Sequence, residues 1–263
     1  MVAQAFSQME TVTEAVPALR PLSTHDITAA LRDGWTDFMA TPTQLLFLCV
    51  LYPVLGFVLA RAAAGGNLLP LVWPLISGFA LVGPLAALGL YEISRRREAG
   101  LQTSWRDTFQ VLQSPSLMAI IGMGAILAVI FALWLLTARA IFALTMGDVL
   151  HEGPMALLQD VFSRPGGTML LLLGNAAGAL FALLVLAISA VSLPMLLDRN
   201  VALGTAIATS VRVFRENPGT MLIWGLVVAA GLAAGMATLF VGLAVTLPLL
   251  GHATWHLYRR AVV

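Results

Sequence analysis

Four ionisable side chains lie near the ends of apolar segments, where they could support chemistry. Each follows a proline of an apolar segment by four or eight residues: Glu92 follows Pro84, Asp198 follows Pro194, and His252 and His256 follow Pro248. If these segments are equivalent helices, two carboxylates and two imidazoles meet at one level, where they could bind a metal or relay protons. The alternative, which we favour, is that they pair with nearby arginines and anchor the helices.

His252 and His256 also share one face of a helix, because a spacing of four residues returns to the same side. Such a pair could ligate a metal or hold a haem, but HxxxH is a weak motif and the chain has no HExxH. The neighbouring Trp255 and Tyr258 are typical of the aromatic belt at a membrane–water interface. We therefore expect no metal and no cofactor, and a polar cluster that anchors.

Other polar residues give weaker signals. A predicted external insertion, residues 139–167, carries four groups that could form a metal site: Asp148, His151, Glu152 and Asp160. The simpler interpretation is that these polar side chains lie in a loop that is exposed to water. Residues 155–162 predict a short helix on the outer leaflet. Asn175 lies deep in an apolar segment inside a GxxxG pattern, and residues 231–235 form another, so both predict close packing of helices.

The composition indicates which elements must position these groups. The 263 residues are 59% hydrophobic and 10% charged, with a mean hydropathy of +0.92, whereas soluble domains average roughly 45–50% and about 25%. These values exclude a disordered chain and an ordinary soluble enzyme, and they favour an all-α polytopic membrane protein. The balance of 14 basic and 13 acidic residues, with no basic stripe, argues against nucleic-acid binding. A single cysteine, Cys49, permits no intrachain disulfide.

Apolar segments predict about six membrane spans, since one span needs about 20 residues. The last apolar block, 219–258, would be about 60 Å long as one helix, twice the hydrocarbon thickness of roughly 30 Å. We therefore divide it, with the turn near Gly231 and Gly235. The predicted spans are 44–64, 69–94, 117–138, 168–197, 219–236 and 238–258.

Arginine placement predicts that both termini are cytoplasmic. With six spans, eleven arginines fall inside and three outside, whereas five spans give nine against five. Residues 1–22 lack the basic start and apolar core of a signal peptide, so we expect a flexible N-terminal tail before a single membrane domain, residues 23–263. The predicted location is the bacterial inner (cytoplasmic) membrane, with the lipid bilayer as the first partner.

An internal repeat divides this domain into units 23–98, 99–200 and 201–263. Three segments carry apolar residues at i, i+4, i+8 and i+11, each ending three or four residues before a proline that precedes a span: Ile27–Leu31–Trp35–Phe38, Leu101–Trp105–Phe109–Leu112 and Leu203–Ile207–Val211–Phe214. We predict an amphipathic helix over 24–41, 99–114 and 203–216, either at the headgroup boundary or packed as a cytoplasmic collar. Each unit is then one such helix followed by a helical hairpin.

The chain resembles a known family at three places: GFALVGPLAALGLYEISRRREAG at 78–100, LPLLGHATWHLYRRAV at 247–262, and the opening SxxDI and GWxDF at 23–27 and 34–38. These stretches are similar to the bacterial integral membrane proteins of domain-of-unknown-function family 2189. The resemblance implies an inner-membrane protein and supplies no catalytic residues. Some members carry a label that names them as cytochrome c oxidase subunits.

These patterns favour a non-enzymatic membrane scaffold or accessory subunit, with a respiratory cytochrome oxidase complex as one partner that the label suggests. The chain has no lysine for a phosphate-binding loop, no GxSxG and no Rossmann fingerprint. A small transporter or channel is the alternative, because proline-interrupted spans and repeats occur in transporters. A haem- or metal-binding protein that uses His252 and His256 is the second alternative.

Overall fold

The computed structural model describes residues 17–43, 69–147, 154–238 and 240–263. Over these residues the chain is helical, with no strand beyond one isolated bridge. The elements are α2 (Thr24–Ala40), η1 (Leu69–Leu71), α4 (Val72–Ala86), α5 (Leu88–Glu98), η2 (Trp105–Gln113), α6 (Leu117–Met146), α7 (Pro154–Ser163), α8 (Pro165–Ser189), α9 (Ser192–Asp198), α10 (Leu203–Glu216), α11 (Pro218–Ala237) and α12 (Leu243–Ala261). The all-α class predicted from composition is thus shown.

Three helical segments in the described part are long and apolar enough to cross a membrane: Leu117–Met146, Pro165–Asp198 and Pro218–Ala237. The first has 30 residues and is about 45 Å long, so it continues well past residue 138, where we predicted its end. Residues 139–146 therefore belong to α6 and not to an external insertion. The predicted span 44–64 lies outside the described residues, and the count of six stays a prediction.

A proline accounts for one break in the apolar segments. A proline has no N–H to donate, and its ring clashes with the carbonyl four residues earlier. Pro194 lies four residues after Ala190, where α8 gives way to α9. Pro84 and Pro248, in contrast, lie inside the helices α4 and α12, and the break between α4 and α5 falls at Ala87, three residues after Pro84.

The turn between α11 and α12 differs from our prediction. Thr238 and residues 240–242 are turn residues, Phe240 has a φ of 66°, and Gly231 and Gly235 lie within α11. A Cβ on Gly235 would lie 3.0 Å from the backbone nitrogen of Leu243, and one on Gly231 would lie 3.1 Å from a Leu250 methyl. The two glycines therefore permit close packing of α11 on α12, as the GxxxG pattern indicated, and do not form the turn.

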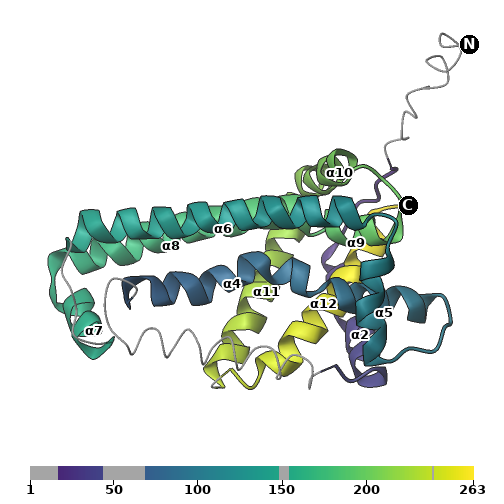
Figure 1. The fold of residues 1–263 in the computed structure, drawn as a ribbon, viewed down its shortest axis with the longest axis horizontal. Coiled ribbons are helices and arrows are strands. Elements are labelled where there is room, and N and C mark those ends of the chain that lie inside the picture. The colour runs from purple at the N-terminus through teal and green to yellow at the C-terminus, as the bar shows by residue number, and fades with distance from the viewer. Residues whose placement is uncertain (1–16, 44–68, 148–153, 239) are drawn as a thin grey trace, which may run out of the picture.

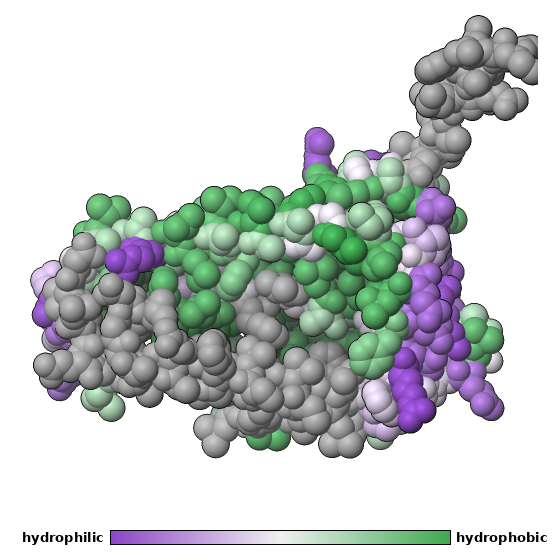
Figure 2. All heavy atoms as spheres, viewed as in Figure 1, coloured by the Kyte–Doolittle hydropathy of each residue, from purple (hydrophilic) through white to green (hydrophobic). Residues whose placement is uncertain are grey.

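Polar elements gather at one end of the molecule. Figure 1 shows α2, α5, α9 and the C-terminus there, with α7 at the far end of α6 and α8, and Figure 2 shows hydrophilic residues at that same end and hydrophobic ones along the bundle. We call the end that carries α2, α5, α9 and the C-terminus the polar end.

Both ends of the described chain meet at the polar end. Leu19 forms an antiparallel bridge with Val262. The Arg20 N–H donates to the Ala261 carbonyl at 2.9 Å, and the Val263 N–H donates to the Ala18 carbonyl at 3.0 Å. Residues 18–20 and 261–263 therefore lie side by side at the polar end.

Candidate functional site

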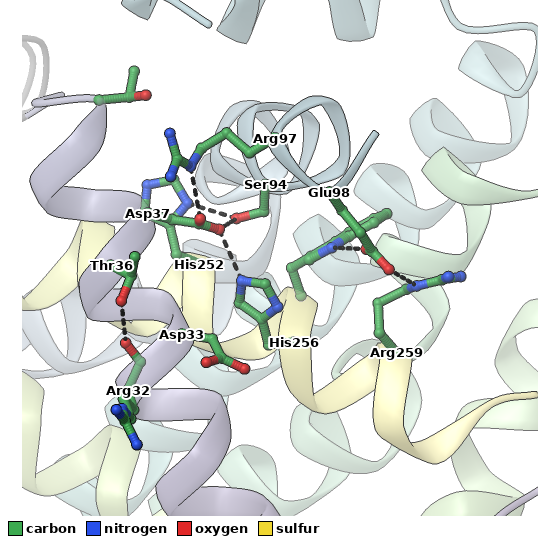
Figure 3. A network of polar contacts seen from close by, with 12 residues as sticks. Arg32, Asp33, Thr36, Asp37, Ser94, Arg97, Glu98, His252, His256 and Arg259 are labelled. Atoms are coloured by element: carbon green, nitrogen blue, oxygen red, sulfur yellow. Dashed lines mark hydrogen bonds and ion pairs between the residues drawn. The ribbon is translucent and has the colours of Figure 1, made fainter. Parts of the chain in front are cut away.

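Five polar residues from three helices form a buried network at the polar end (Figure 3). Asp37 of α2 is its centre: one carboxylate oxygen, Oδ2, accepts hydrogen bonds from the Ser94 hydroxyl at 2.6 Å and from His256 Nε2 at 2.8 Å. The other oxygen accepts from Arg97 Nε at 2.8 Å. His252 Nδ1 lies 2.8 Å from the Ser94 hydroxyl. We call these residues the Asp37 network.

Small residues bring α2 and α12 close enough for this network to form. Ala30 and Ala253 are fully buried, and a Cβ on Gly34 would lie 2.6 Å from the backbone nitrogen of Ala253. The buried face of α2 consists of Ile27, Ala30, Gly34, Asp37 and Phe38. This face is rotated from the stripe that we predicted, so that Trp35 points outward and is 47% exposed.

The environment of Asp37 keeps its carboxylate charged. Burial raises the pKa of Asp37, but hydrogen bonds from His256, Ser94 and Arg97 lower it by more, and the pKa falls to about 2. A carboxylate that accepts several hydrogen bonds is stabilised in its ionised form. Asp37 is therefore an acceptor only, in a site where 8% of its side chain is exposed.

Counting protons then fixes the tautomer of His252. The single hydroxyl proton of Ser94 is donated to Asp37, so Ser94 can only accept from the imidazole, and His252 Nδ1 must carry the proton. Nε2 of the neutral ring keeps a lone pair. That atom is buried and has no hydrogen-bond partner among the described residues. Such an orphaned polar atom costs about 1–3 kcal/mol.

The network does not have the geometry of a hydrolase. In a catalytic triad, histidine lies between the serine and the carboxylate and takes the serine proton. Here Ser94 lies between His252 and Asp37 and donates its proton to the carboxylate. Its hydroxyl is therefore not activated as a nucleophile, and Ser94 is fully buried.

The two histidines do not converge on a metal position either. His252 points Nδ1 to Ser94, and His256 points Nε2 to Asp37. Among the described residues, no group of three or more His, Cys, Asp or Glu side chains could hold a metal ion.

A second polar network ties α12 to α5 and α9. Asp198 accepts from the Tyr258 hydroxyl at 2.7 Å and from Arg259 Nη1 at 3.1 Å. Glu98 accepts from Arg259 Nε at 3.0 Å and from Trp255 Nε1 at 3.1 Å. Arg259 thus joins the ends of three helices.

The four residues of the predicted cluster divide between separate partners. His252 and His256 join the Asp37 network, Asp198 pairs with Arg259, and the buried Glu92 pairs with Arg95 at 2.8 Å. No hydrogen bond or ion pair joins any two of the four within the described chain. They lie at the same end of the molecule, but they do not form one ring.

Sequence reasoning missed two members of the network, Asp37 and Ser94, whereas Arg97 belongs to the arginines that we expected to anchor this end. Asp37 lies in the GWxDF stretch at 34–38, and it belongs to the buried face of α2 and not to the stripe that we predicted. Ser94 had no signal, because only the docking of α12 beside α5 brings it to His252.

Each predicted amphipathic segment packs on other helices of the described chain. α2 packs on α12, η2 packs on α5, and α10 packs on α8 and α9. Each of the first two contacts contains an ion pair between an arginine and an aspartate. Arg260 of α12 contacts Asp33 of α2 at 2.6 Å, and Arg96 of α5 contacts Asp107 of η2 at 3.7 Å. Both arginines lie twelve residues after the proline of their segment.

The third contact uses a serine instead of an ion pair. The Ser210 hydroxyl of α10 donates to the Ala187 carbonyl at 2.8 Å and accepts from the Val191 N–H at 3.2 Å. Ser210 and Asp107 both lie eight residues before the next proline. The second segment is shorter than predicted: η2 is a 3-10 helix over Trp105–Gln113 and not an α-helix over 99–114.

The remaining polar candidates have local partners. Asn175 is exposed, and its Nδ2 donates to the Leu171 carbonyl of its own helix at 2.7 Å. Asp160 pairs with Arg164 at 2.9 Å. The other members of the external set, residues 148–152, lie outside the described residues. The predicted helix at 155–162 corresponds to α7.

A groove of about 600 Å³ opens between α4, α6, α7 and α8, far from the Asp37 network. Trp73, Trp134, Phe142 and Leu171 are among the residues that line it, and Asn175 adds one polar amide. Such a lining fits an apolar occupant.

Comparison with known proteins bears out the resemblance over the middle of the chain. Residues 72–198 match the family described as predicted integral membrane protein (DUF2189). The match includes the stretch at 78–100, whereas the similar stretches at 23–38 and 247–262 lie outside it. No curated protein and no solved structure matches the chain. The structure and this match together define an integral membrane protein.

Proposed function

We propose that this protein is a non-enzymatic scaffold or accessory subunit, which binds protein partners within the bilayer. The observation that carries the proposal is the division of its surface. Polar side chains at the polar end are engaged with one another, while α6 and α8 turn large apolar residues outward (Figure 2). Leu136 and Leu180, for example, are 67% and 68% exposed. Outward apolar faces of this kind contact lipid or another apolar helix.

The docking contacts support a rigid body of three repeat units. In this proposal the amphipathic segment of each unit docks on the hairpin of the unit before it, and α2 closes the ring by docking on α12 of the last unit. The equivalent pairs Arg260–Asp33 and Arg96–Asp107 support this reading. A body closed in this way presents fixed surfaces, as a scaffold requires.

The meeting of the termini supports six spans in the same proposal. Because residues 18–20 bond to residues 261–263, the chain crosses the membrane an even number of times. Three spans alone would place the termini on opposite sides. The positive-inside rule then places the polar end in the cytoplasm of a bacterial cell.

Purification in a mild detergent, followed by native mass spectrometry, tests the proposal. We expect a stoichiometric complex with another membrane protein, or with a second copy, that survives washing. A cytochrome oxidase would be the partner that the family label suggests. A protein that is monomeric and alone in several mild detergents would contradict the scaffold function.

Two observations keep the alternatives testable. The groove with Asn175 favours a transporter. Flux of an ion or solute in liposomes would support this alternative if the flux stops in Gly178→Phe, which fills the groove. The free Nε2 of His252 is the feature that a haem or metal protein would use. A Soret band, or bound metal that is lost in His252→Leu, would support that alternative.

A further inference from the structure

The segment η2 turns a polar side toward the protein and large apolar side chains outward. Asp107 has only 14% of its side chain exposed and lies 3.7 Å from Arg96 of α5. Trp105, Phe109 and Leu112, in contrast, are 48%, 54% and 66% exposed. Large apolar side chains that gather on a surface mark a contact with a partner or a membrane. The outward face of η2 therefore requires an occupant other than water.

The contact with α5 holds η2 in this orientation. Arg96 Nη1 donates to Gln110 Oε1 at 2.7 Å. Thr108 packs on Gly89, where an added Cβ would lie 2.7 Å from the Thr108 Cβ. Val111 is the buried apolar side chain of the segment. Because these contacts fix one side of η2 on the protein, the outward side cannot rotate inward to bury its apolar residues.

The 3-10 geometry adds a positive charge to the outward face. Side chains three residues apart eclipse one another in a 3-10 helix, so Arg106, Phe109 and Leu112 form one line along η2. The guanidinium carbon of Arg106 lies 5.6 Å from the centre of the Trp105 ring, which is a cation–π contact. No ion pair within the described residues involves Arg106, so its N–H groups can bind an anion.

The position of η2 in the chain places this face at the membrane surface. Only Ser114, Pro115 and Ser116 separate η2 from α6, which is long and apolar enough to cross a membrane. A link of this length reaches at most about 14 Å. Met118, in the first turn of α6, is 77% exposed, so large apolar side chains face outward on both sides of the link.

We propose that η2 binds the bilayer surface and that Arg106 holds the phosphate of an anionic phospholipid there. Trp105, Phe109 and Leu112 enter the boundary between headgroups and acyl chains, where aromatic side chains are favoured. The guanidinium donates to the phosphate oxygens, and the negative headgroup layer complements its charge. This site gives the protein a lipid preference, which the scaffold function alone does not supply.

Spin labels on the full chain, in nanodiscs of phosphatidylcholine and phosphatidylglycerol, test the position of η2. In a Cys49→Ala background, one label is attached to Leu112→Cys and a control label to Gln113→Cys, the next residue, which is exposed on another side of η2. We expect oxygen, which concentrates in the bilayer, to relax the label at 112 more than a water-soluble nickel chelate does. The label at 113 should show the reverse.

Two outcomes of this measurement would overturn the proposal. Equal relaxation of both labels by the nickel chelate would place the outward face of η2 in water. Protection of the label at 112 from oxygen and from the chelate would mean that a protein, such as a second copy of the chain, covers the face.

Native mass spectrometry of the full chain, with added phosphatidylglycerol or phosphatidylcholine, tests the role of Arg106. We expect Arg106→Gln to weaken phosphatidylglycerol binding about fivefold, as for the loss of one arginine near an anionic surface, and to leave phosphatidylcholine binding unchanged. Arg212→Gln removes the same charge from an exposed pair with Glu216 on α10 and should change neither. Equal losses in the two variants, or no loss in Arg106→Gln, would contradict a phosphate site at Arg106.

Discussion

Asp37 shows how a single carboxylate can determine the arrangement of three helices. It accepts hydrogen bonds from α5 and α12 while belonging to α2. Sequence patterns predicted that histidines and carboxylates would lie at this end, and they do. They could not identify Asp37 as the centre, because its partners lie 57 or more residues away along the chain.

Removal of the Asp37 charge should lower stability and flatten its dependence on acid pH. The pKa of Asp37 in the folded protein, about 2, lies below its ordinary value of 3.8. Its contribution is therefore complete above pH 3.8 and is lost as the pH falls toward 2, with a size of about 2 kcal/mol.

Thermal unfolding in detergent between pH 2 and 7 measures this effect in Asp37→Asn. We expect lower stability than the unmodified protein at pH 7 and a smaller loss toward pH 2. Asp107→Asn, at the contact of η2 with α5, is the matched control and should keep the acid-dependent loss. An unchanged pH profile in Asp37→Asn would show that the carboxylate is not stabilised as described.

His252 should act as an anchor whose volume matters more than its polarity. His252 is fully buried and lies four residues after Pro248, and the residue four positions after Pro84 is Leu88. We expect His252→Ala to lose about 2–4 kcal/mol of unfolding free energy because it leaves a cavity. His252→Leu fills that volume and removes the orphaned Nε2, so its loss should stay within about 1 kcal/mol.

Denaturant titration of both variants in detergent measures the difference. Equal losses in His252→Ala and His252→Leu would contradict an anchor of this kind. A His252→Leu protein that folds normally but loses a transport activity or a bound metal would make the residue a functional site.

At the scale of elements, hydropathy predicted the helices better than their ends and contacts. It could not distinguish a glycine that forms a turn from one that permits packing, so the turn of the last hairpin was placed at Gly231 and Gly235. The amphipathic face of α2 was displaced by one position for a related reason. Trp35 has a large aromatic side chain and Gly34 has none, so the stripe was drawn through Trp35, but the close approach of α12 requires the glycine.

Gly34→Ala should disrupt the contact between α2 and α12. The added Cβ would lie 2.6 Å from the backbone nitrogen of Ala253, which cannot move without moving α12. We expect a loss of about 1–3 kcal/mol, typical of overpacking. Gly204→Ala in α10 is the control, because no atom lies within 4 Å of its Cβ position.

In that control, alanine should be neutral or stabilising by up to about 1 kcal/mol, since alanine favours helix more than glycine does. The unfolding free energies of both variants in one detergent decide the matter. A Gly34→Ala protein as stable as Gly204→Ala would mean that α2 does not approach α12 so closely.

At the scale of the whole molecule, the closed polar end makes a prediction about topology. Residues 18–20 are hydrogen-bonded to residues 261–263, and α7 lies at the opposite end of α6 and α8 (Figure 1). In intact cells of a bacterial host, a membrane-impermeant thiol reagent should therefore label Ser163→Cys in a Cys49→Ala background. Val263→Cys should be labelled only after the membrane is opened, and labelling of both in intact cells would contradict six spans.

The scaffold function itself is tested most directly by photo-cross-linking in the native membrane. A photoreactive residue would replace Leu136 or Leu180, which face outward, or Met123, which is fully buried in α6, as the control. We expect the outward positions to form a discrete cross-linked band with one protein partner or a second copy, and Met123 to form none. Cross-links to lipid alone from both outward positions would contradict a scaffold that binds partners through α6 and α8.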